Sequence, residues 1–333
     1  MASSPLTQAD PFLACFNRRL DTREAMPFAE FMDLALYDPD YGYYRQDRDR
    51  VARRPGADFY TAESFREVFS ALIAAAAVDL LEGRDPSTFA FVEIGAEPDG
   101  GLLPEAMTGF REFRVVRLGE ETDLASRAIV FSNELFDAQP FHRVVRRGGR
   151  WIEAGVALRE GSLVWSDLEP VSLVLADRIS QLPVDAPEAA IIDLPIAAAG
   201  LLGNQVAGQW EGLLIAADYG KSWAALAEDY PEGTGRAYRN HRQEKDLLAN
   251  PGHQDLTCFI CWDWMQAVLE QNRFSAIRVE SQEAFFMRHA PGVIRNIIAG
   301  PGGPLSPRHS QLKTLLHPGL MGQKFQVLHG ARF

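Results

Sequence analysis

Four short apolar runs, each bounded by polar turns, most constrain what this chain can fold into. They are FAFVEI at 89–94, FRVVRL at 113–118, RAIVFSN at 127–133 and GLLIAADYG at 212–220. Each is too short for a typical helix, and its continuous apolarity indicates a strand that is buried on both faces. Such strands alternating with helical segments are typical of an α/β protein. We therefore predict a mostly parallel sheet with helices on both of its faces.

The segments around these runs predict helices and a second kind of sheet. A long helix is expected over AESFREVFSALIAAAAVDLLEG, which Gly83 ends. Between 141 and 168, strand-like runs separated by Arg-Gly-Gly-Arg and Glu-Gly-Ser predict an antiparallel meander. Shorter helices are expected at 26–37, 104–110 and 262–270, a final strand at 276–281, and an edge strand within 315–330.

Composition and charge exclude several classes of protein. The chain has 333 residues, 47% of them apolar, which is typical of a globular protein with a substantial core. Its formal net charge of −12 argues against a nucleic-acid partner, and the arginines between 45 and 54 are interleaved with aspartates. No apolar stretch is long enough to span a bilayer, and the N-terminus lacks a signal-peptide pattern. We expect a cytoplasmic protein with no membrane partner.

Three cysteines are too few for a disulfide framework. Cys258 and Cys261 form a C-x-x-C, a spacing found in zinc and redox sites. A structural zinc site needs a second pair of ligands, and no other C-x-x-C or H-x-x-H is present. We therefore interpret the pair as two small apolar residues at the start of the helix that follows, and we predict no metal site.

Polar side chains follow each predicted strand, at the edge where ligands of open α/β sheets bind. Carboxylates dominate that edge, so it suits a cationic ligand better than a phosphate. Each carboxylate alone is also a common cap or turn residue, so both interpretations stay open. The residues are Glu93, Gly95, Glu120, Glu121, Asn133, Glu134, Asp137, Asp218 and Tyr219.

The stretch FVEIGAEPDGG has the position of a cofactor-binding loop after a strand. Gly95 is present, but four other residues precede the next glycines. Glu120 lies after the second strand, where an acid commonly binds ribose hydroxyls. This spacing fits both NAD proteins and S-adenosylmethionine methyltransferases. The absence of a dinucleotide fingerprint disfavours a dehydrogenase.

Several motifs occur in the order seen in the MidA family, and the chain resembles that family from about Met26 onward. The motifs include YDPDYGYY, FVEIG, NELFDAQP, GTGRAYRNH, PGHQDLT and HPGLMGQKFQVL. Members are S-adenosyl-L-methionine (SAM)-dependent methyltransferases and include mitochondrial complex I assembly arginine methyltransferases. The resemblance implies an N-terminal helical segment and lid at 1–88 and a Rossmann-like core at 89–333, interrupted by a β-rich subdomain at 141–210.

The chain departs from the family pattern at three places. The family's V-E-L-G-P-G-R-G is VEIGAEPD here, so Glu97 and Asp99 replace glycines and are expected to weaken SAM binding. Only ETDLASRA separates Glu120 from IVFSNE, where the family has another strand and helix. The family's D-L-T-A-H-V-D-F is DLTCFICW.

The resemblance assigns roles to named residues. Glu134 and Asp137 are expected to hold and deprotonate the acceptor, although either can also fix the turn. Asp58 and Thr61 resemble a segment that covers the site, and can equally cap the helix near Ser64. Predicted cofactor-binding residues are Glu93, Gly95, Glu120, Asn133, Asp58 and Thr61.

Two functions follow from these observations. The first is methylation of a protein side chain, with arginine favoured. The second is a catalytically inactive relative that acts as a binding or assembly factor, and the altered loop favours it. In both cases the partner is a protein that the sequence does not identify.

Overall fold

A computed structural model describes residues 11–45, 65–96, 101, 109–239 and 242–333. The chain forms two compact units, each made from several segments. One unit, called the sheet unit here, comprises Val51–Phe136, Leu201–Gly220 and Trp262–Phe333. The other, the hairpin unit, comprises Met1–Arg50, Asp137–Gly200 and Lys221–Cys261.

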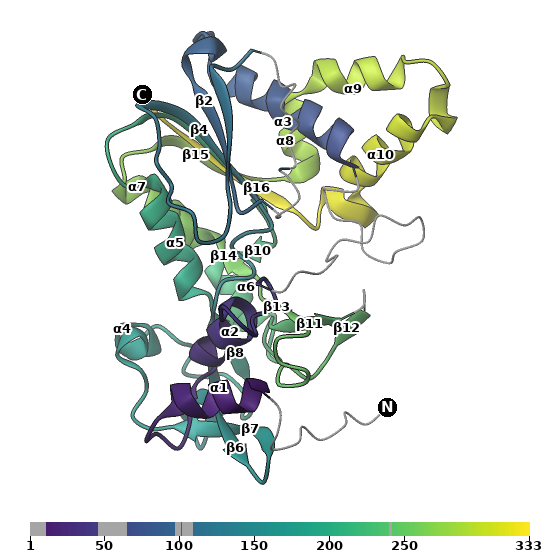
Figure 1. Ribbon diagram of the computed structural model, residues 1–333. Helices are drawn as coiled ribbons and strands as arrows, with labels where there is room; N and C mark the ends of the chain where they lie inside the picture. The colour runs from purple at the N-terminus through teal and green to yellow at the C-terminus, as the bar shows by residue number, and fades with distance from the viewer. Residues whose placement is uncertain (1–10, 46–64, 97–100, 102–108, 240–241) are drawn as a thin grey trace. The chain divides into compact units, whose positions relative to one another are not determined.

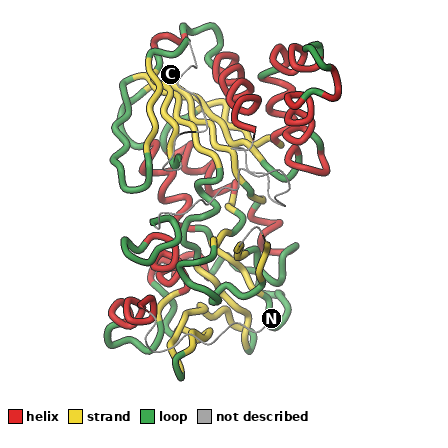
Figure 2. The backbone as a smooth tube through the Cα atoms, turned by 45° about the vertical axis from the view of Figure 1, so that its right-hand side comes forward, coloured by secondary structure: helices red, strands yellow, loops and turns green. Residues whose placement is uncertain are grey.

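The sheet unit is built around six strands in the order β15-β16-β9-β4-β2-β3 (Figures 1 and 2). Strands β3, β2, β4 and β9 are parallel neighbours, and β16 runs antiparallel to both β9 and β15. The mostly parallel sheet predicted from the apolar runs is therefore confirmed. The strands are β2 (Ala90–Ile94), β3 (Glu112–Val116), β4 (Arg127–Asn133), β9 (Glu211–Asp218), β15 (Ser275–Ser281) and β16 (Gln326–Arg332).

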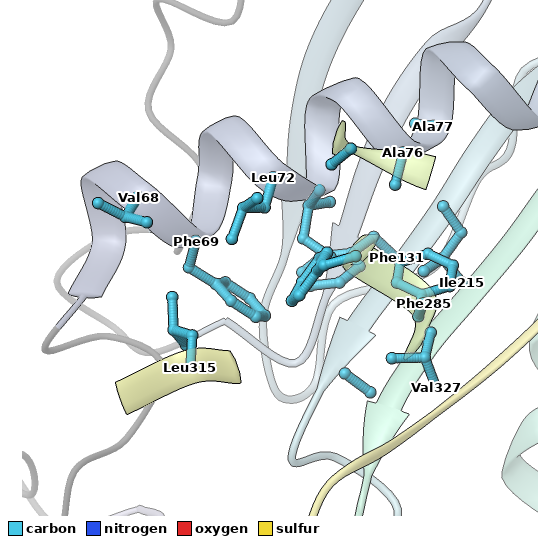
Figure 3. Packing of buried hydrophobic residues seen from close by; sticks show 14 of the residues in the cluster. Val68, Phe69, Leu72, Ala76, Ala77, Phe131, Ile215, Phe285, Leu315 and Val327 are labelled. Atoms are coloured by element: carbon cyan, nitrogen blue, oxygen red, sulfur yellow. The ribbon is translucent and has the colours of Figure 1, made fainter. Parts of the chain in front are cut away.

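One face of this sheet is covered by α3 (Arg66–Leu80), the long helix expected from its periodicity. Phe69 and Leu72 of α3 point toward Phe131 and Ile215 of the sheet, as Figure 3 shows. Burial of one such side chain contributes about 1.5–3 kcal/mol to the free energy of unfolding. This apolar layer fixes the position of the strands whose ends carry the candidate site.

Further helices extend the same layer and cover the second face. Helices α8 (Gln282–His289), α9 (Pro291–Ile298) and α10 (Pro307–Leu316) contribute buried residues to the cluster around α3, and none of them was predicted from the sequence. Helix α7 (Trp262–Gln271) packs against β15 and β16. A Cβ on Gly330 of β16 would lie 3.4 Å from Leu269 of α7, so α7 covers the face opposite His329.

The prediction that the C-terminal strand lies at the edge of the sheet is wrong. Strand β16 lies inside the sheet, hydrogen-bonded to β9 on one side and β15 on the other. Residues 327–330 are all buried, as an interior strand requires. The edge position is taken by β15 instead, whose burial pattern contains no fully buried residue.

The hairpin unit contains an antiparallel sheet, β1-β6-β5-β8, with β7 paired to β6. Its β5–β6 turn is the two-residue Gly148-Gly149, both with positive φ (55° and 75°), a conformation that favours glycine. The antiparallel hairpins predicted between 141 and 168 are therefore present. The strands are β1 (Met26–Pro27), β5 (His142–Arg147), β6 (Arg150–Arg159), β7 (Ser162–Leu168) and β8 (Ile191–Leu194).

The remaining elements complete the two units. The helix expected from Met26 begins at Phe28, because Met26–Pro27 pairs with β6 as β1. Helices α1 and α2 form a second core that includes Phe28, Phe31 and Phe141. The other elements are α1 (Pro11–Leu20), α2 (Phe28–Tyr37), α4 (Ala176–Ile179), α5 (Ile196–Val206), α6 (Trp223–Glu228), β10 (Gly220–Lys221), β11 (Arg236–Arg239), β12 (Arg242–Glu244), β13 (Asp255–Thr257) and β14 (Ile260–Cys261).

Among the helices in the described ranges, none combines the length and apolarity needed to cross a membrane.

Candidate functional site

The carboxyl ends of β2, β4 and β9 bring four predicted site residues to one edge of the sheet unit. Ile94 is paired with Ser132, and Asn133 with Ala217, so the three strands end together. Glu93 and Gly95 therefore share this edge with Asn133 and Glu134. Ligands of open α/β sheets bind at such an edge.

Two glycines allow close backbone approach at the end of β2. Gly95 has a φ of 84°, and a Cβ there would lie 2.7 Å from Cδ1 of Leu135. A Cβ on Gly101 would lie 2.5 Å from Oε2 of Glu93, whose residue is only 2% exposed. Gly101 thus lies against the Glu93 carboxylate, at a position where a side chain would displace its neighbours. Gly101 was not singled out from the sequence, because its contact with Glu93 joins two residues on opposite sides of the loop and leaves no local pattern.

Glu134 occupies an unusual backbone conformation directly after β4. Its φ is 48°, which is uncommon for a residue with a side chain. The Glu134 N–H donates to the carbonyl of Ala217 at 3.0 Å, and Nδ2 of Asn133 donates to its Oε1 at 3.1 Å. Non-glycine residues in this region concentrate at functional sites, where surrounding contacts hold them.

Glu120 lies past the end of β3, at the same edge of the sheet. Its Oε2 accepts a hydrogen bond of 2.8 Å from the backbone N–H of Arg117. Residues 117–126, which connect β3 to β4, carry neither helix nor strand. This connection is short and has no helix or strand, and Glu120 closes a turn within it.

Asp137 belongs to the hairpin unit, where it is 6% exposed. Its carbonyl accepts the Cys258 N–H at 2.9 Å, and the hydroxyl of Tyr37 donates to the neighbouring Ala138 carbonyl at 2.9 Å. Three motifs that are far apart in the sequence therefore meet around this segment. Their residues hold its backbone in a defined conformation.

Tyr37 stacks on Tyr44 with ring centroids 5.5 Å apart, and the Tyr44 hydroxyl donates to Oδ1 of Asp255 at 2.8 Å. Burial raises the pKa of both phenols, and the nearby charge of Asp255 raises the pKa further. Both side chains therefore stay neutral and act as hydrogen-bond donors. The sequence showed these tyrosines only as an aromatic turn, because Asp255 is 211 residues from Tyr44.

The remaining predicted residues fall into two groups. Asp58, Thr61, Glu97 and Asp99 lie outside the described residues. Cys258 and Cys261 are 2% and 1% exposed, which agrees with their interpretation as small buried residues before α7.

A family model described as "Putative S-adenosyl-L-methionine-dependent methyltransferase" matches residues 102–279. No curated protein matches the chain.

Two solved structures from Burkholderia thailandensis have a similar fold. One is a "COG1565 superfamily member and likely methyl transferase" bound to S-adenosyl-homocysteine, with 22% identity, a TM-score of 0.83, and coverage of 98% of this chain and 95% of that one. The other is a native structure of an uncharacterized protein of the same superfamily, with 21% identity, a TM-score of 0.78 and the same coverages. The fold is therefore that of an α/β methyltransferase. Because the family model spans more than half of the sequence, the chain belongs to this family of S-adenosyl-L-methionine-dependent methyltransferases, whose cofactor is the one predicted from the sequence.

Proposed function

We propose that this chain methylates a protein side chain, with arginine as the favoured acceptor, and that it is a relative of the MidA methyltransferases. The observation that carries the proposal is the conformation of Glu134. Its backbone is held at a positive φ by the Ala217 carbonyl, and its carboxylate is oriented by Asn133. A carboxylate placed in this way at a ligand-binding edge suits a cationic acceptor.

The described residues at this edge fit a SAM molecule. Gly95 and Gly101 leave their backbone uncovered by a Cβ, and Gly101 lies against the carboxylate of the buried Glu93. Glu93, Gly95 and Asn133 are the residues we propose to hold the cofactor, with Glu120 at the ribose. When bound, SAM supplies an electrophilic methyl group and a thioether leaving group.

Arginine methylation at this edge needs orientation of the guanidinium and removal of one proton. The acceptor nitrogen forms its bond to the methyl carbon while the methyl–sulfur bond breaks and its electron pair stays on sulfur. Glu134 first binds the guanidinium and then takes the proton that the nitrogen loses. Asn133 keeps the Glu134 carboxylate pointed in one direction, so that less orientational entropy is lost during the reaction.

Asp137 remains our second proposed acceptor-binding residue. Its carboxylate is almost fully buried, in a segment whose backbone is fixed by Tyr37 and Cys258. Lys221 and Arg236 in the hairpin unit lie over the ring of Phe259, at 5.8 and 4.4 Å from its centroid. The family motif has a histidine at the position of Phe259. The phenyl ring makes cation–π contacts but cannot accept a proton.

The test uses the full chain, radiolabelled SAM, and paired basic peptides that differ only in having arginine or lysine at each cationic position. Incorporation into the arginine peptide that is lost in Glu134→Gln supports the proposal. Equal incorporation into the lysine peptide would remove the preference for arginine. SAM binding without transfer to either peptide would exclude side-chain methylation of this class.

A second candidate function is a catalytically inactive binding or assembly factor. It is favoured by the Glu120 carboxylate, which accepts the Arg117 N–H of its own turn, and by the acids Glu97 and Asp99 in the loop. This candidate predicts that calorimetric titration with SAM and S-adenosylhomocysteine gives no heat, while the basic peptides still bind. If the chain binds SAM at micromolar concentration, its cofactor site is not defective, and inactivity for that reason is excluded.

A further inference from the structure

Two histidines and a glutamate converge in the sheet unit on the face covered by α3 and α8. Glu280 is the penultimate residue of β15, and His289 is the last residue of α8. His329 lies in β16 opposite Ile215. One side-chain atom from each lies within 4.8 Å of the others. The three residues are called the His-Glu cluster below.

Both histidines of the His-Glu cluster lie near the same carboxylate oxygen of Glu280. Oε2 of Glu280 lies 3.1 Å from Nε2 of His329 and 3.7 Å from Nε2 of His289. Ligands of a tetrahedral zinc ion, at about 2.0–2.1 Å from the metal, lie about 3.3–3.4 Å from one another. The two distances from Oε2 of Glu280 are therefore within a few tenths of an ångström of that spacing, and the third pair of ligand atoms lies within 4.8 Å.

One ring nitrogen of His289 is buried and has no hydrogen-bond partner among the described residues. Its Nδ1 lies 2.8 Å from Oδ2 of Asp79 in α3, so Nδ1 carries the proton that this carboxylate accepts. Its Nε2 is fully buried and unsatisfied. A buried polar atom without a partner costs about 1–3 kcal/mol. A metal ion bound to Nε2 would remove that cost.

The contact between Asp79 and His289 has the form of an outer-shell interaction in known metal sites. A metal-binding histidine almost always donates its other N–H to a carboxylate or carbonyl, which fixes the tautomer and makes the free nitrogen a better ligand. Asp79 is 56% exposed at its side chain, and it contacts the cluster through His289. Its position is therefore that of an orienting group and not of a ligand.

Charge and surroundings also favour a divalent cation. Oε1 of Glu280 pairs with Arg288 at 2.9 Å, which leaves Oε2 for the two histidines. The side chains of Glu280 and His289 are each 10% exposed, and that of His329 is 5% exposed. The ring of Phe285 packs against both imidazoles, at 5.2 Å from His289 and 5.4 Å from His329.

We propose that Oε2 of Glu280, Nε2 of His289 and Nε2 of His329 bind a Zn²⁺ ion, with water at the fourth position. Binding displaces the proton that His329 shares with Glu280. The ion would join α8 to β15 and β16, in addition to the Arg288–Glu280 ion pair between α8 and β15. No metal site was predicted from the sequence, because the three ligands have no recognisable spacing.

The first experiment measures the zinc content and melting temperature of the full chain after dialysis against Zn²⁺ and then against buffer. We expect one equivalent of zinc and a higher melting temperature than in the metal-free chain. His289→Gln should remove the bound zinc. His253→Gln, which changes an exposed histidine of the hairpin unit, should leave it unchanged.

Asp79→Asn separates metal binding from folding, because Asp79 is exposed at the surface of α3. We expect this variant to bind Zn²⁺ about 10- to 100-fold more weakly, with an unchanged melting temperature in the absence of metal. Absorption spectra of the Co²⁺-loaded chain should show nitrogen and oxygen ligation without thiolate charge transfer. The proposal is overturned if no zinc is retained, if His289→Gln retains it, or if thiolate bands place the metal on Cys258 and Cys261.

Discussion

The backbone N–H of Phe136 donates a hydrogen bond of 2.8 Å to Oδ2 of Asp218, which is fully buried and 82 residues further along the chain. Oδ1 of the same carboxylate accepts the Tyr219 N–H at 2.7 Å. The end of β9 thus fixes the turn that carries Glu134. Asp218, the last residue of β9, therefore shapes this edge through these two hydrogen bonds.

Asp218→Asn should destabilise the sheet unit and weaken the proposed activity together. The amide cannot accept hydrogen bonds from both N–H groups, and hydrogen bonds to a charged group contribute about 1.5–3 kcal/mol. We expect the free energy of unfolding, measured in urea, to fall by about that amount. Asp185→Asn, at an exposed position, is the control and should have no effect. An unchanged stability in Asp218→Asn would show that the turn is held by other contacts.

Glu134→Gln should lower the methylation rate about 10²- to 10⁴-fold, the usual range for a positioned acid–base group. The substitution preserves size and the hydrogen bond to the Ala217 carbonyl, so unfolding should be unchanged. SAM affinity, measured by calorimetry, should also be unchanged. Full activity in this variant would leave Glu134 with only a role in the turn.

The double change Glu97→Gly, Asp99→Gly should tighten SAM binding. Replacing two acids near the carboxylate of the cofactor removes like-charge repulsion and restores backbone freedom in the loop. The expected gain is about 1–3 kcal/mol, or about 5- to 150-fold in dissociation constant. If binding weakens instead, the loop uses a different geometry in which an acid contacts the amino group of SAM. If neither protein binds SAM, the short connection after Glu120 has removed part of the adenine pocket.

The hairpin unit should lose stability in acid because of Glu153. Burial alone would raise the pKa of this carboxyl, but hydrogen bonds from His142 and Ser172 outweigh burial and lower its pKa. Its stabilising contribution is therefore present above the unfolded-state pKa of about 4.3, and is lost as pH falls through the lower folded-state value.

Urea unfolding between pH 6 and pH 3 measures this contribution. Glu153→Gln should be less stable at pH 6 and should show a smaller loss of stability on acidification than the unsubstituted chain. Glu228→Gln, on the surface of α6, should retain the full pH dependence. An identical pH dependence in Glu153→Gln would assign acid unfolding to other carboxyls.

The sequence predicted those parts of the fold that depend on local apolarity. Strand β4 occupies 127–133 as expected, because a short run buried on both faces has a distinctive composition. The position of β16 could not be predicted, since strand order is set by pairing between distant segments. Helices α8 to α10 were missed because each spans only 8 to 10 residues, which is a short window for recognising helical periodicity.

The candidate site was also predicted only in part from the sequence. The shared edge of Glu93, Asn133 and Glu134 follows from the rule that parallel strands carry their carboxyl ends together. Contacts made across long sequence separations, such as Tyr44 to Asp255, leave no local pattern. The hydrogen bond from Arg117 to Glu120 is local, but a turn-closing acid and a ribose-binding acid have the same sequence appearance.

The interior position of β16 has a consequence for the order of events during protein synthesis. Strands β9 and β15 leave the ribosome well before residues 326–332, yet each depends on those residues for a neighbour. Until then, the nascent sheet exposes one side of β9, where another chain could add a strand. A ribosome that stalls before residue 326 would therefore release an aggregation-prone product, whereas completion of β16 closes the sheet in a single step.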